Sequence, residues 1–564
     1  MTQRATSARV ADPITTEVVR NGLVTAAEQM KVVLCRAAYS PVIYEMYDFA
    51  CALFDREVRV LGQGRGMPLF LGTLGPSVKA IVDAVGGEES LRPGDVLFST
   101  YGYEIGSHQQ DAAVVLPGFH EGQLVGYAGV KAHHLDVGAK APYCTDTTDI
   151  FQEGTIFPGV KLWREGVRQD DLYRTLVANS RLPQALEGDL NAEVAAAKRG
   201  LDELNALIDR HGKPVFDRSV EAMYNHGEAL IRSYLADVPD GRYVGRCALD
   251  DNGLDRELVP FELVVEIDGS DMIVDFTGAP PQQAGPVNCP YPTTLSAARC
   301  ALMALAGGAE DANEGHFRPL SIRTTPGTLF HPEPPAPVFI FGATAILAVD
   351  VIHRALADAL PGKVPAGSGG DICSFMMWGE DESGELWITG CDHTVGQGAW
   401  NAADGGAPLI VIATSGERNI PAEAMEARFP FLVERLELAV DSGGAGERRG
   451  GLGIDQHYRV LRNFSLTSAF ERSRTPPWGL SGGGEGRPNS WGVRDPHGTF
   501  TAYPKVTGLE IAAGSVVEVR TGGGGGFGDP RARPPEKVLD DVRNGYVSEE
   551  AAARDYPHVD LTAV

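Results

Sequence analysis

The stretch that most constrains the fold is residues 104–138, in which two apolar segments lie between clusters of histidine and aspartate. Residues 111–117 and 124–132 are rich in Val, Ala and Leu, a composition typical of buried strands. Residues 118–123 separate them, and the Glu-Gly pair there is typical of a turn. The stretch therefore predicts a β-hairpin with its polar residues gathered at the open end.

With this six-residue loop, Pro117 would pair with Leu124 and His108 would face His133. Imidazole and carboxylate groups bind first-row divalent metals. A set of His108, Asp111 and His133 resembles a two-histidine, one-carboxylate site, which leaves positions open for water or substrate. The alternative is that these are ordinary hydrogen-bonded polar residues at a sheet edge.

The alternation of side chains along a strand decides which residues of this set can meet. His108 and Asp111 would point to opposite faces of one strand, so His108 must precede the strand, as Gly106 and Ser107 permit. His133 and His134 also point to opposite faces, so one of them is expected to bind. The predicted pairing favours His133.

Composition excludes several classes of partner. The net charge of −26 and the pI of about 4.9 argue against nucleic acid and anionic membranes, which need clustered Lys and Arg. We find no apolar core of a signal peptide at the N-terminus and no run of membrane-spanning length. The eight cysteines form no C-x-x-C pair, which predicts buried thiols in a reducing cytoplasm.

The pattern of the chain changes near residue 240. Residues 1–240 predict a mixed α/β domain with long amphipathic helices, which carries the metal site. Residues 241–564 predict a strand-rich, Gly- and Pro-rich region with short helices and a C-terminal tail that contacts a partner. The predicted class is α+β with more than one domain.

Two glycine-rich stretches, residues 441–453 and 521–530, lack the features of nucleotide sites. No G-K-[S/T] follows either one, and neither has the strand, glycine turn and helix of a dinucleotide site. Tight turns or a subunit contact are the favoured interpretation, and a backbone cradle for an anion is the alternative.

Acidic residues outside the hairpin are further candidates. Glu45 and Asp48 stand just before a buried strand that is predicted to end at Asp55. We expect capping or surface roles for them, with a place on the wall of a site as the alternative. Glu153 is a candidate general base.

Motifs spread over most of the chain resemble those of the hydantoinase B / 5-oxoprolinase family. They are DFACALFD (48–55), GSHQQD (106–111), AHHLDVG (132–138), FQEG (151–154), DFTG (275–278), GPVN (285–288), DSGGAG (441–446), RGGLGI (449–454), PPWGL (476–480), GGGFGDP (524–530) and DVRNG (541–545). This family includes the B-type subunits of ATP-dependent hydantoinases and related subunits of acetone and acetophenone carboxylases.

The resemblance implies a larger A-type partner, which binds ATP and phosphorylates the substrate's carbonyl or enol oxygen. The B-type subunit then carries out the second half-reaction. In the acetone carboxylase branch a His-x-x-Asp and a later His hold a divalent metal, and these map onto His108, Asp111 and His133. Two departures beside this site, at residues 100–105 and at the paired His133 and His134, prevent us from transferring the substrate or the metal's identity.

The leading hypothesis is a cytoplasmic B-type subunit of an ATP-dependent amidohydrolase of the hydantoinase, oxoprolinase or lactamase type. It would form a hetero-oligomer, act on a small molecule and hold Zn, Mn or Fe, with ATP bound by the partner. His134 or Asp136 would orient a ligand or shuttle a proton. One alternative is a subunit of an ATP-dependent ketone carboxylase, and another is a noncatalytic scaffold.

Overall fold

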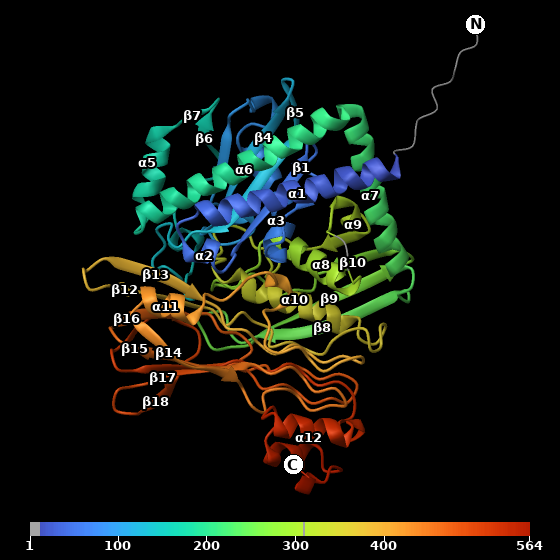
Figure 1. Ribbon diagram of the computed structural model, residues 1–564, viewed down its shortest axis with the longest axis vertical. Helices are drawn as coiled ribbons and strands as arrows, with labels where there is room; N and C mark the ends of the chain where they lie inside the picture. The colour runs from blue at the N-terminus through green and yellow to red at the C-terminus, as the bar shows by residue number, and fades with distance from the viewer. Residues whose placement is uncertain (1–11, 308–310, 564) are drawn as a thin grey trace.

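The computed structural model describes residues 12–307 and 311–563 and has the multi-domain α+β architecture that the sequence predicts. The N-terminal sheet and the long helices fill the upper part of Figure 1, and the C-terminal sheets lie below them. The boundary predicted near residue 240 falls between helix α7 (Lys213–Leu235) and strand β8 (Gly241–Leu249). The division into two domains at that point stays a prediction.

A seven-stranded antiparallel sheet forms the centre of the N-terminal part. In spatial order its strands are β2 (Val60–Gln63), β1 (Phe49–Asp55), β5 (Gln123–His133), β4 (Asp111–His120), β3 (Val96–Ser99), β6 (Val160–Arg164) and β7 (Val167–Arg168). Strands β1, β4 and β5 are buried along most of their length. Their sequences are continuous apolar runs because helices cover both faces of the sheet.

Two long helices, α1 (Pro13–Ala37) and α6 (Pro183–His211), pack on one face of this sheet, and α3 (Pro68–Ala84) packs on the other. Helix α1 begins where the Asp12 side chain accepts a hydrogen bond from the backbone N–H of Thr15. Proline at the first helical position suits this start, because its missing N–H would have no partner there. The sequence predicted this helix at residues 17–38.

The hairpin is confirmed, but its predicted register is wrong. The turn consists of Glu121 and Gly122 alone, both with positive φ (48° and 78°), as a two-residue type I′ turn requires. The strands therefore continue further towards the turn than expected, so that Asp111 pairs with His133 and Pro117 pairs with Tyr127. His108 precedes strand β4, as the sequence predicts.

Three further sheets and two buried helices form the C-terminal part. The sheets are, in spatial order, β11 (Leu320–Arg323), β10 (Asp271–Asp275), β9 (Val259–Asp268) and β8; β13 (Leu386–Cys391), β12 (Phe375–Glu380), β16 (Phe464–Ser468) and β19 (Val506–Ile511); and β14 (Phe431–Leu438), β15 (Ile454–Val460), β20 (Val516–Arg520), β17 (Ser490–Arg494) and β18 (Phe500–Ala502). Helices α8 (Tyr291–Leu305) and α10 (Phe341–Ala355) pack against each other in the largest core.

Short helices complete the structure. They are α2 (Pro41–Tyr44), α4 (Gly102–Ile105), α5 (Asp170–Ala178), α9 (Glu314–Phe317), α11 (Ala422–Arg428), α12 (Pro535–Arg543) and α13 (Glu549–Asp555). Helices α12 and α13 share a small core of their own, and the buried Arg533 joins them to the rest of the chain through ion pairs with Asp404 and Asp541, both at 2.7 Å. The predicted contact of this tail with a partner stays a prediction.

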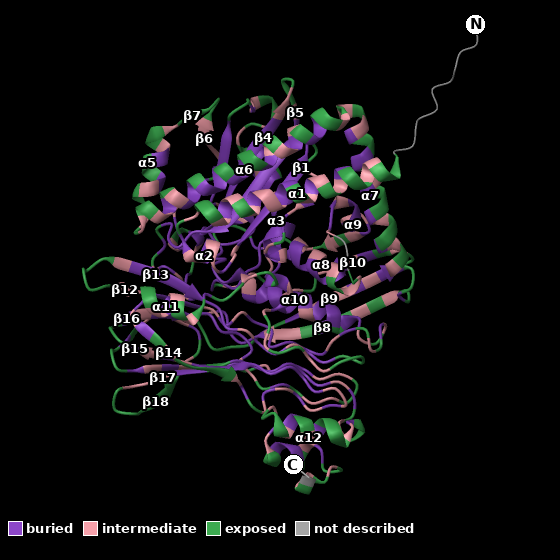
Figure 2. Ribbon diagram, in the orientation of Figure 1, coloured by how far each residue is buried: buried purple, intermediate pink, exposed green. Residues whose placement is uncertain are grey.

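The glycine-rich stretch at residues 521–530 packs as extended backbone rather than as a tight turn, and the alternative of a subunit contact stays a prediction. A Cβ atom on Gly524 would lie 1.9 Å from the carbonyl oxygen of Gln397, and one on Gly525 equally close to that of Trp478. The N–H of Gly524 donates to Gly451 and that of Gly525 to Gly367. Because neighbouring segments use these N–H groups, they are not free to hold an anion. Figure 2 shows closely spaced, buried segments without regular secondary structure in this lower part of the molecule.

All eight cysteines are free thiols, and six of them are buried as the sequence predicts, whereas Cys35 and Cys247 are half-buried. Within the described part of the chain, no helix is both long enough and apolar enough to cross a bilayer.

Candidate metal centre

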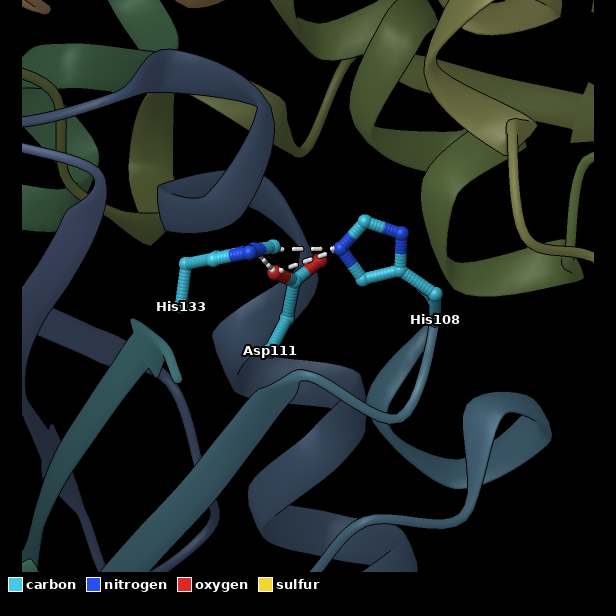
Figure 3. A group of neighbouring side chains, drawn as sticks. All are labelled: His108, Asp111 and His133. Carbon is cyan, nitrogen blue, oxygen red and sulfur yellow. Dashed lines mark hydrogen bonds and ion pairs between the residues drawn. The ribbon is translucent and has the colours of Figure 1, made fainter. Parts of the chain in front are cut away.

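The fold brings His108, Asp111 and His133 together, and we refer to these three residues as the triad (Figure 3). His108 comes from the loop before β4, Asp111 from the first position of β4, and His133 from the last position of β5. His108 Nε2 lies 3.0 Å from Asp111 Oδ1 and 3.2 Å from His133 Nδ1, which in turn is 2.9 Å from Asp111 Oδ1. All three side chains are buried.

These distances suit a shared metal ion. Ligand atoms bonded to one metal at about 2.1 Å and at right angles lie about 3.0 Å apart. His108 Nδ1 is 2.8 Å from the carbonyl oxygen of Phe339, which can only accept, so Nδ1 carries a proton, and in the neutral ring Nε2 presents a lone pair. That lone pair would face a carboxylate oxygen of Asp111, and the two would repel unless a proton or a metal cation lay between them. The second oxygen of Asp111 is buried without a hydrogen-bond partner.

The triad opens into a cavity of about 80 Å³ that we call the triad cavity. Three more carboxyl groups line it, those of Asp48, Asp392 and Glu417. The remaining wall is mainly apolar, and no lysine or arginine is among the lining residues. Buried carboxyl groups require a compensating positive charge or a proton. The triad cavity therefore carries the charge and the donor atoms of a cation site.

The acidic groups influence one another's protonation. Burial raises the pKa of Asp48 to about 7 and that of Asp392 to about 6, although His133 opposes both shifts. Burial, reinforced by Asp392 and Asp48, also raises the pKa of Glu417 well above its usual range. Burial acts in the same direction on Asp111, but His108 and His133 overcome it and hold the pKa of Asp111 well below its usual range.

The structure places His134 and Asp136 outside the triad cavity. His134 points to the opposite face of the sheet, where its Nε2 lies 2.8 Å from Glu193 Oε1 of helix α6. The Asp136 carboxylate accepts hydrogen bonds at 2.5 Å from the backbone N–H and the guanidinium of Arg181. The structure thus brings three of the five predicted site residues together, and these two flank the strand end that carries His133.

Two other acidic residues that the sequence singled out have roles different from those expected for them. Asp48, for which a capping or surface role was expected, lines the triad cavity, and its Oδ2 lies 3.8 Å from His133 Nδ1. Glu153 lies outside the cavity wall and accepts hydrogen bonds from the backbone N–H groups of Val338 (2.8 Å) and Phe339 (3.0 Å). It therefore fixes the segment whose carbonyl orients His108.

Sequence reasoning missed Asp392 and Glu417. Asp392 directly follows the apolar strand β13. A carboxylate at the end of an apolar strand is the pattern that pointed to Asp111, so it could have identified Asp392 as a candidate. Glu417 lies in a loop and belongs to no motif. The sequence gives no indication of its position.

Comparison with known proteins assigns the family. A profile of the Hydantoinase B/oxoprolinase family matches residues 12–530. The chain belongs to this family. The beta subunit of the caprolactamase of Pseudomonas jessenii is 33% identical, over 97% of this chain and 96% of that protein. A protein of Pseudomonas sp. (strain NS671), named as the putative B-type subunit of a D-/L-hydantoinase, is 30% identical over 99% of this chain and 96% of its own length.

Solved structures agree with this assignment. The crystal structure of the ATP-dependent caprolactamase from P. jessenii superposes with a TM-score of 0.92 at 31% identity, over 99% of this chain and 98% of that one. An acetone carboxylase structure superposes with a TM-score of 0.87 over 97% of this chain and 79% of that one, at 19% identity. The second likeness shows a shared fold. Further relatives are named as 5-oxoprolinases, and of these amidohydrolases the caprolactamase is the one described as ATP-dependent.

Proposed function

We propose that this chain is the B-type subunit of an ATP-dependent amidohydrolase and performs the hydrolytic half-reaction at the triad cavity. The observation that carries the proposal is the composition of that cavity. It gathers four carboxyl groups and two imidazoles with no lysine or arginine on its wall. Such a cluster is a poor structural element, because removing carboxylates from water without a counter-charge costs several kcal/mol per ion.

His108, Asp111 and His133 would hold a divalent cation, for which Zn, Mn and Fe are the candidates. Bound there, the cation supplies positive charge that acidifies water and stabilises negative charge on a substrate oxygen. The chain itself fixes the tautomer and the positions of the donor atoms. The Phe339 carbonyl fixes the His108 tautomer, and the hairpin register places Asp111 directly across from His133.

Residues around the triad would complete the site. Asp48 is the carboxyl group next to His133 and has one oxygen without a hydrogen-bond partner, so it is placed to accept a proton from an attacking water. His134, through Glu193, and Asp136, through Arg181, hold the end of β5 and the segment after it. We assign these two a positioning role for His133.

An A-type subunit would supply the activated substrate. An amide carbon is a poor electrophile, and phosphorylation of the amide oxygen provides a good leaving group. The two Pseudomonas relatives are each named as one subunit of a larger enzyme, and one of these enzymes is ATP-dependent, which supports a hetero-oligomer with the ATP site on the partner. Neither glycine-rich stretch of this chain has the sequence of a nucleotide loop, which agrees with that division of labour.

The test is Asp111→Asn in the complex that this chain forms with its partner. We expect hydrolysis of lactams or hydantoins to fall by more than about 100-fold, because a metal ligand is lost, while ATP cleavage by the partner continues. His120→Gln is the matched control, since His120 pairs with Asp209 on the surface. Unchanged hydrolysis would favour the scaffold alternative. Bicarbonate-dependent turnover of ketones, with none of cyclic amides, would favour the carboxylase alternative.

A further inference from the structure

Tyr143 lines the triad cavity but has no role in the site described so far. It lies in the segment that follows β5, so the stretch of chain that presents His133 also presents this tyrosine. Its backbone carbonyl accepts a hydrogen bond from Thr467 Oγ1 at 2.9 Å, but within the described residues its hydroxyl has no partner. A tyrosine hydroxyl in a protein interior usually has an acceptor. One that lines a cavity without an acceptor is placed to bind a ligand.

Aromatic contacts hold the Tyr143 ring beside the triad. The centre of the ring lies 4.8 Å from that of Phe339 and 5.7 Å from that of His108, and both contacts are edge-to-face. Two residues further along, the backbone N–H of Thr145 donates to Thr507 Oγ1 on β19 at 2.9 Å. The segment is therefore anchored to the C-terminal part, and the ring has little freedom to turn away from the cavity.

The hydroxyl of Tyr143 lies among the acidic groups of the cavity. Burial raises the pKa of Tyr143 well above its usual range, and the charges of Asp111 and Asp392 add to the shift. Both of these carboxyl groups line the cavity. The Ser374 hydroxyl lines it too, but it already forms a hydrogen bond to Asp392. Tyr143 thus offers a neutral donor in a cavity that is otherwise rich in acceptors.

The proposed reaction needs a donor at the nitrogen of the substrate. Addition of water to a phosphorylated amide gives a tetrahedral carbon that carries a hydroxyl, a phosphate and an amine. Loss of phosphate from this carbon regenerates the amide, so that ATP is cleaved without hydrolysis of the substrate. Loss of the amine completes the hydrolysis. Because phosphate is the better leaving group, the site must stabilise the departing nitrogen by hydrogen bonding and protonation.

We propose that Tyr143 is a further catalytic residue, whose hydroxyl donates a hydrogen bond to the nitrogen of the activated amide and directs the intermediate towards C–N cleavage. This inference rests on the proposed function, because the choice between the two leaving groups exists only for a phosphorylated amide. A phenyl ring at this position would keep the contacts with His108 and Phe339 but would lose the donor.

The protons and electrons balance with Asp48 as the carrier. Water forms a bond to the amide carbon and gives one proton to Asp48, while the electron pair of the C=N bond moves to the nitrogen beside the Tyr143 hydroxyl. Asp48 passes this proton to the nitrogen and then transfers the proton of the new hydroxyl as well, so that the C–N bond breaks and an amine leaves. The acyl phosphate that remains reacts with a second water to give a carboxylate and inorganic phosphate.

The test is the number of ATP molecules cleaved per amide bond hydrolysed, for the unmodified chain and for Tyr143→Phe, each in complex with the A-type partner. The substrate is whichever of ε-caprolactam, 5-oxoproline and hydantoin the unmodified complex hydrolyses fastest. In the variant we expect hydrolysis to fall at least about tenfold and ATP cleavage by less than about twofold, so that the ratio rises at least about fivefold. A purely structural role would lower both rates together.

Tyr173→Phe is the matched control, because it also removes the hydroxyl of a buried tyrosine, but from helix α5 and away from the triad cavity. We expect its ratio to equal that of the unmodified chain. An unchanged ratio in Tyr143→Phe would overturn the assignment and leave the proposed function standing. Failure of the unmodified complex to hydrolyse any of the three amides would overturn both.

Metal analysis of the same proteins separates catalysis by Tyr143 from support of His108. We expect Tyr143→Phe to contain as much metal as the unmodified chain, because the ring that packs on His108 is still present. A raised ratio together with full metal content would support the assignment. A raised ratio together with loss of metal would show that Tyr143 acts through His108, and would overturn its direct contact with the substrate.

Discussion

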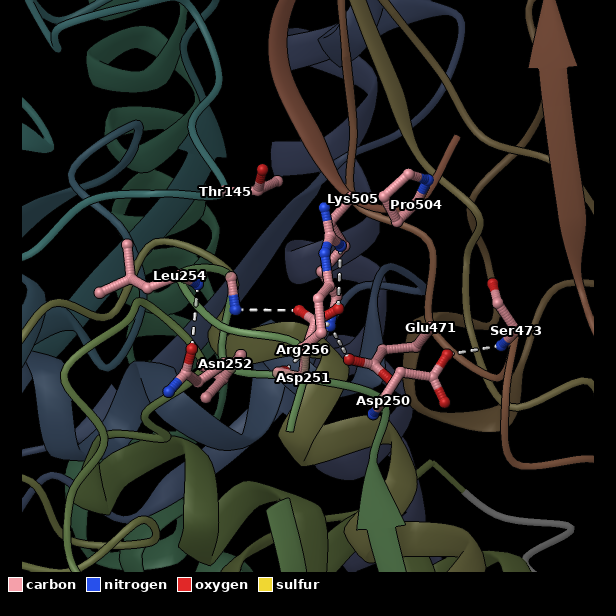
Figure 4. A network of polar contacts seen from close by, with 12 residues as sticks. Thr145, Asp250, Asp251, Asn252, Leu254, Arg256, Glu471, Ser473, Pro504 and Lys505 are labelled. Atoms are coloured by element: carbon pink, nitrogen blue, oxygen red, sulfur yellow. Dashed lines mark hydrogen bonds and ion pairs between the residues drawn. The ribbon is translucent and has the colours of Figure 1, made fainter. Parts of the chain in front are cut away.

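Two clusters of buried charge in this molecule differ in whether their groups find partners. In the C-terminal part, Lys505 Nζ forms ion pairs with Glu471 and with Asp251, the latter at 3.2 Å (Figure 4). The Asp250 carboxylate accepts hydrogen bonds from the backbone N–H groups of Ser473 and Arg474. In the triad cavity, by contrast, carboxylate oxygens of Asp48, Asp111 and Glu417 have no hydrogen-bond partner.

This difference in hydrogen-bond partners indicates that the Lys505 cluster is structural and that the triad cavity is a binding site. The Lys505 cluster joins the segment after β8 to the loops at Glu471 and Lys505, and it carries its own counter-charge. The wall of the triad cavity carries four carboxyl groups and no lysine or arginine, and the one buried lysine that interacts with them, Lys131, does not line it. A buried cluster that the chain leaves uncompensated is complete only when a cation binds, so the two clusters should respond to mutation in opposite ways.

The largest effect on stability is expected for Lys505→Met. The variant leaves Glu471 and Asp251 buried without their cation, which should lower the free energy of unfolding by about 3–5 kcal/mol. Urea denaturation at pH 7 measures the loss. The double variant Lys505→Met/Glu471→Gln should recover part of it, because one of the stranded charges is gone. Unchanged stability of Lys505→Met would show that the two clusters are energetically alike.

A third buried network, around His393, is uncharged and can be compared with the two charged clusters. His393 donates through Nδ1 to the carbonyl oxygen of Cys373 (2.6 Å), and its Nε2 lies 2.9 Å from the Tyr458 hydroxyl. Burial lowers the pKa of His393 from 6.5 to about 4. A base whose pKa is depressed on folding stabilises the protein above pH 6.5, and this contribution is lost as the pH falls from 6.5 to 4.

At pH 5 the loss from His393 amounts to about 2 kcal/mol. Urea denaturation at pH 7 and pH 5 measures it. In His393→Gln the difference in unfolding free energy between these two pH values should be smaller by that amount. An identical difference in the variant would mean that His393 does not titrate on unfolding in this range.

The smallest change in stability is expected for Asp392→Asn, and it is a gain. Asp392→Asn removes one of the uncompensated charges, so the metal-free chain should become more stable at pH 7, by on the order of 1 kcal/mol. Thermal denaturation after EDTA treatment measures this gain. The same measurement with added Mn²⁺ should show a smaller stabilisation by metal in the variant than in the unmodified chain. Destabilisation of the metal-free variant would indicate that the carboxylates are compensated within the chain.

The part of the site that lies close together in sequence could be predicted. Histidine and aspartate at the ends of two apolar segments identified the triad, because a hairpin brings its own strand ends together. The register was wrong because a turn needs only two residues when both have positive φ, and Glu121 gave little sign of that conformation. His133 nevertheless meets Asp111, because alternation along β5 decides which face each histidine occupies.

The rest of the site could not be predicted because it depends on contacts between distant segments. Asp392 and Glu417 reach the triad cavity from beyond residue 380, and Phe339 reaches His108 from more than two hundred residues away. Hydrophobic periodicity identifies single elements but not their packing. The glycine-rich stretches show the same limit, since their close packing against Gln397 and Trp478 has no local signature.

The central claim is that the triad holds a divalent cation, and metal analysis of the purified chain tests it most directly. Elemental analysis of the unmodified protein, His108→Ala and the surface control His120→Ala is the measurement. We expect close to one equivalent of Zn, Mn or Fe in the unmodified chain and in the control, and a small fraction of that in His108→Ala. Equal metal content in all three proteins, or none in any, would contradict it.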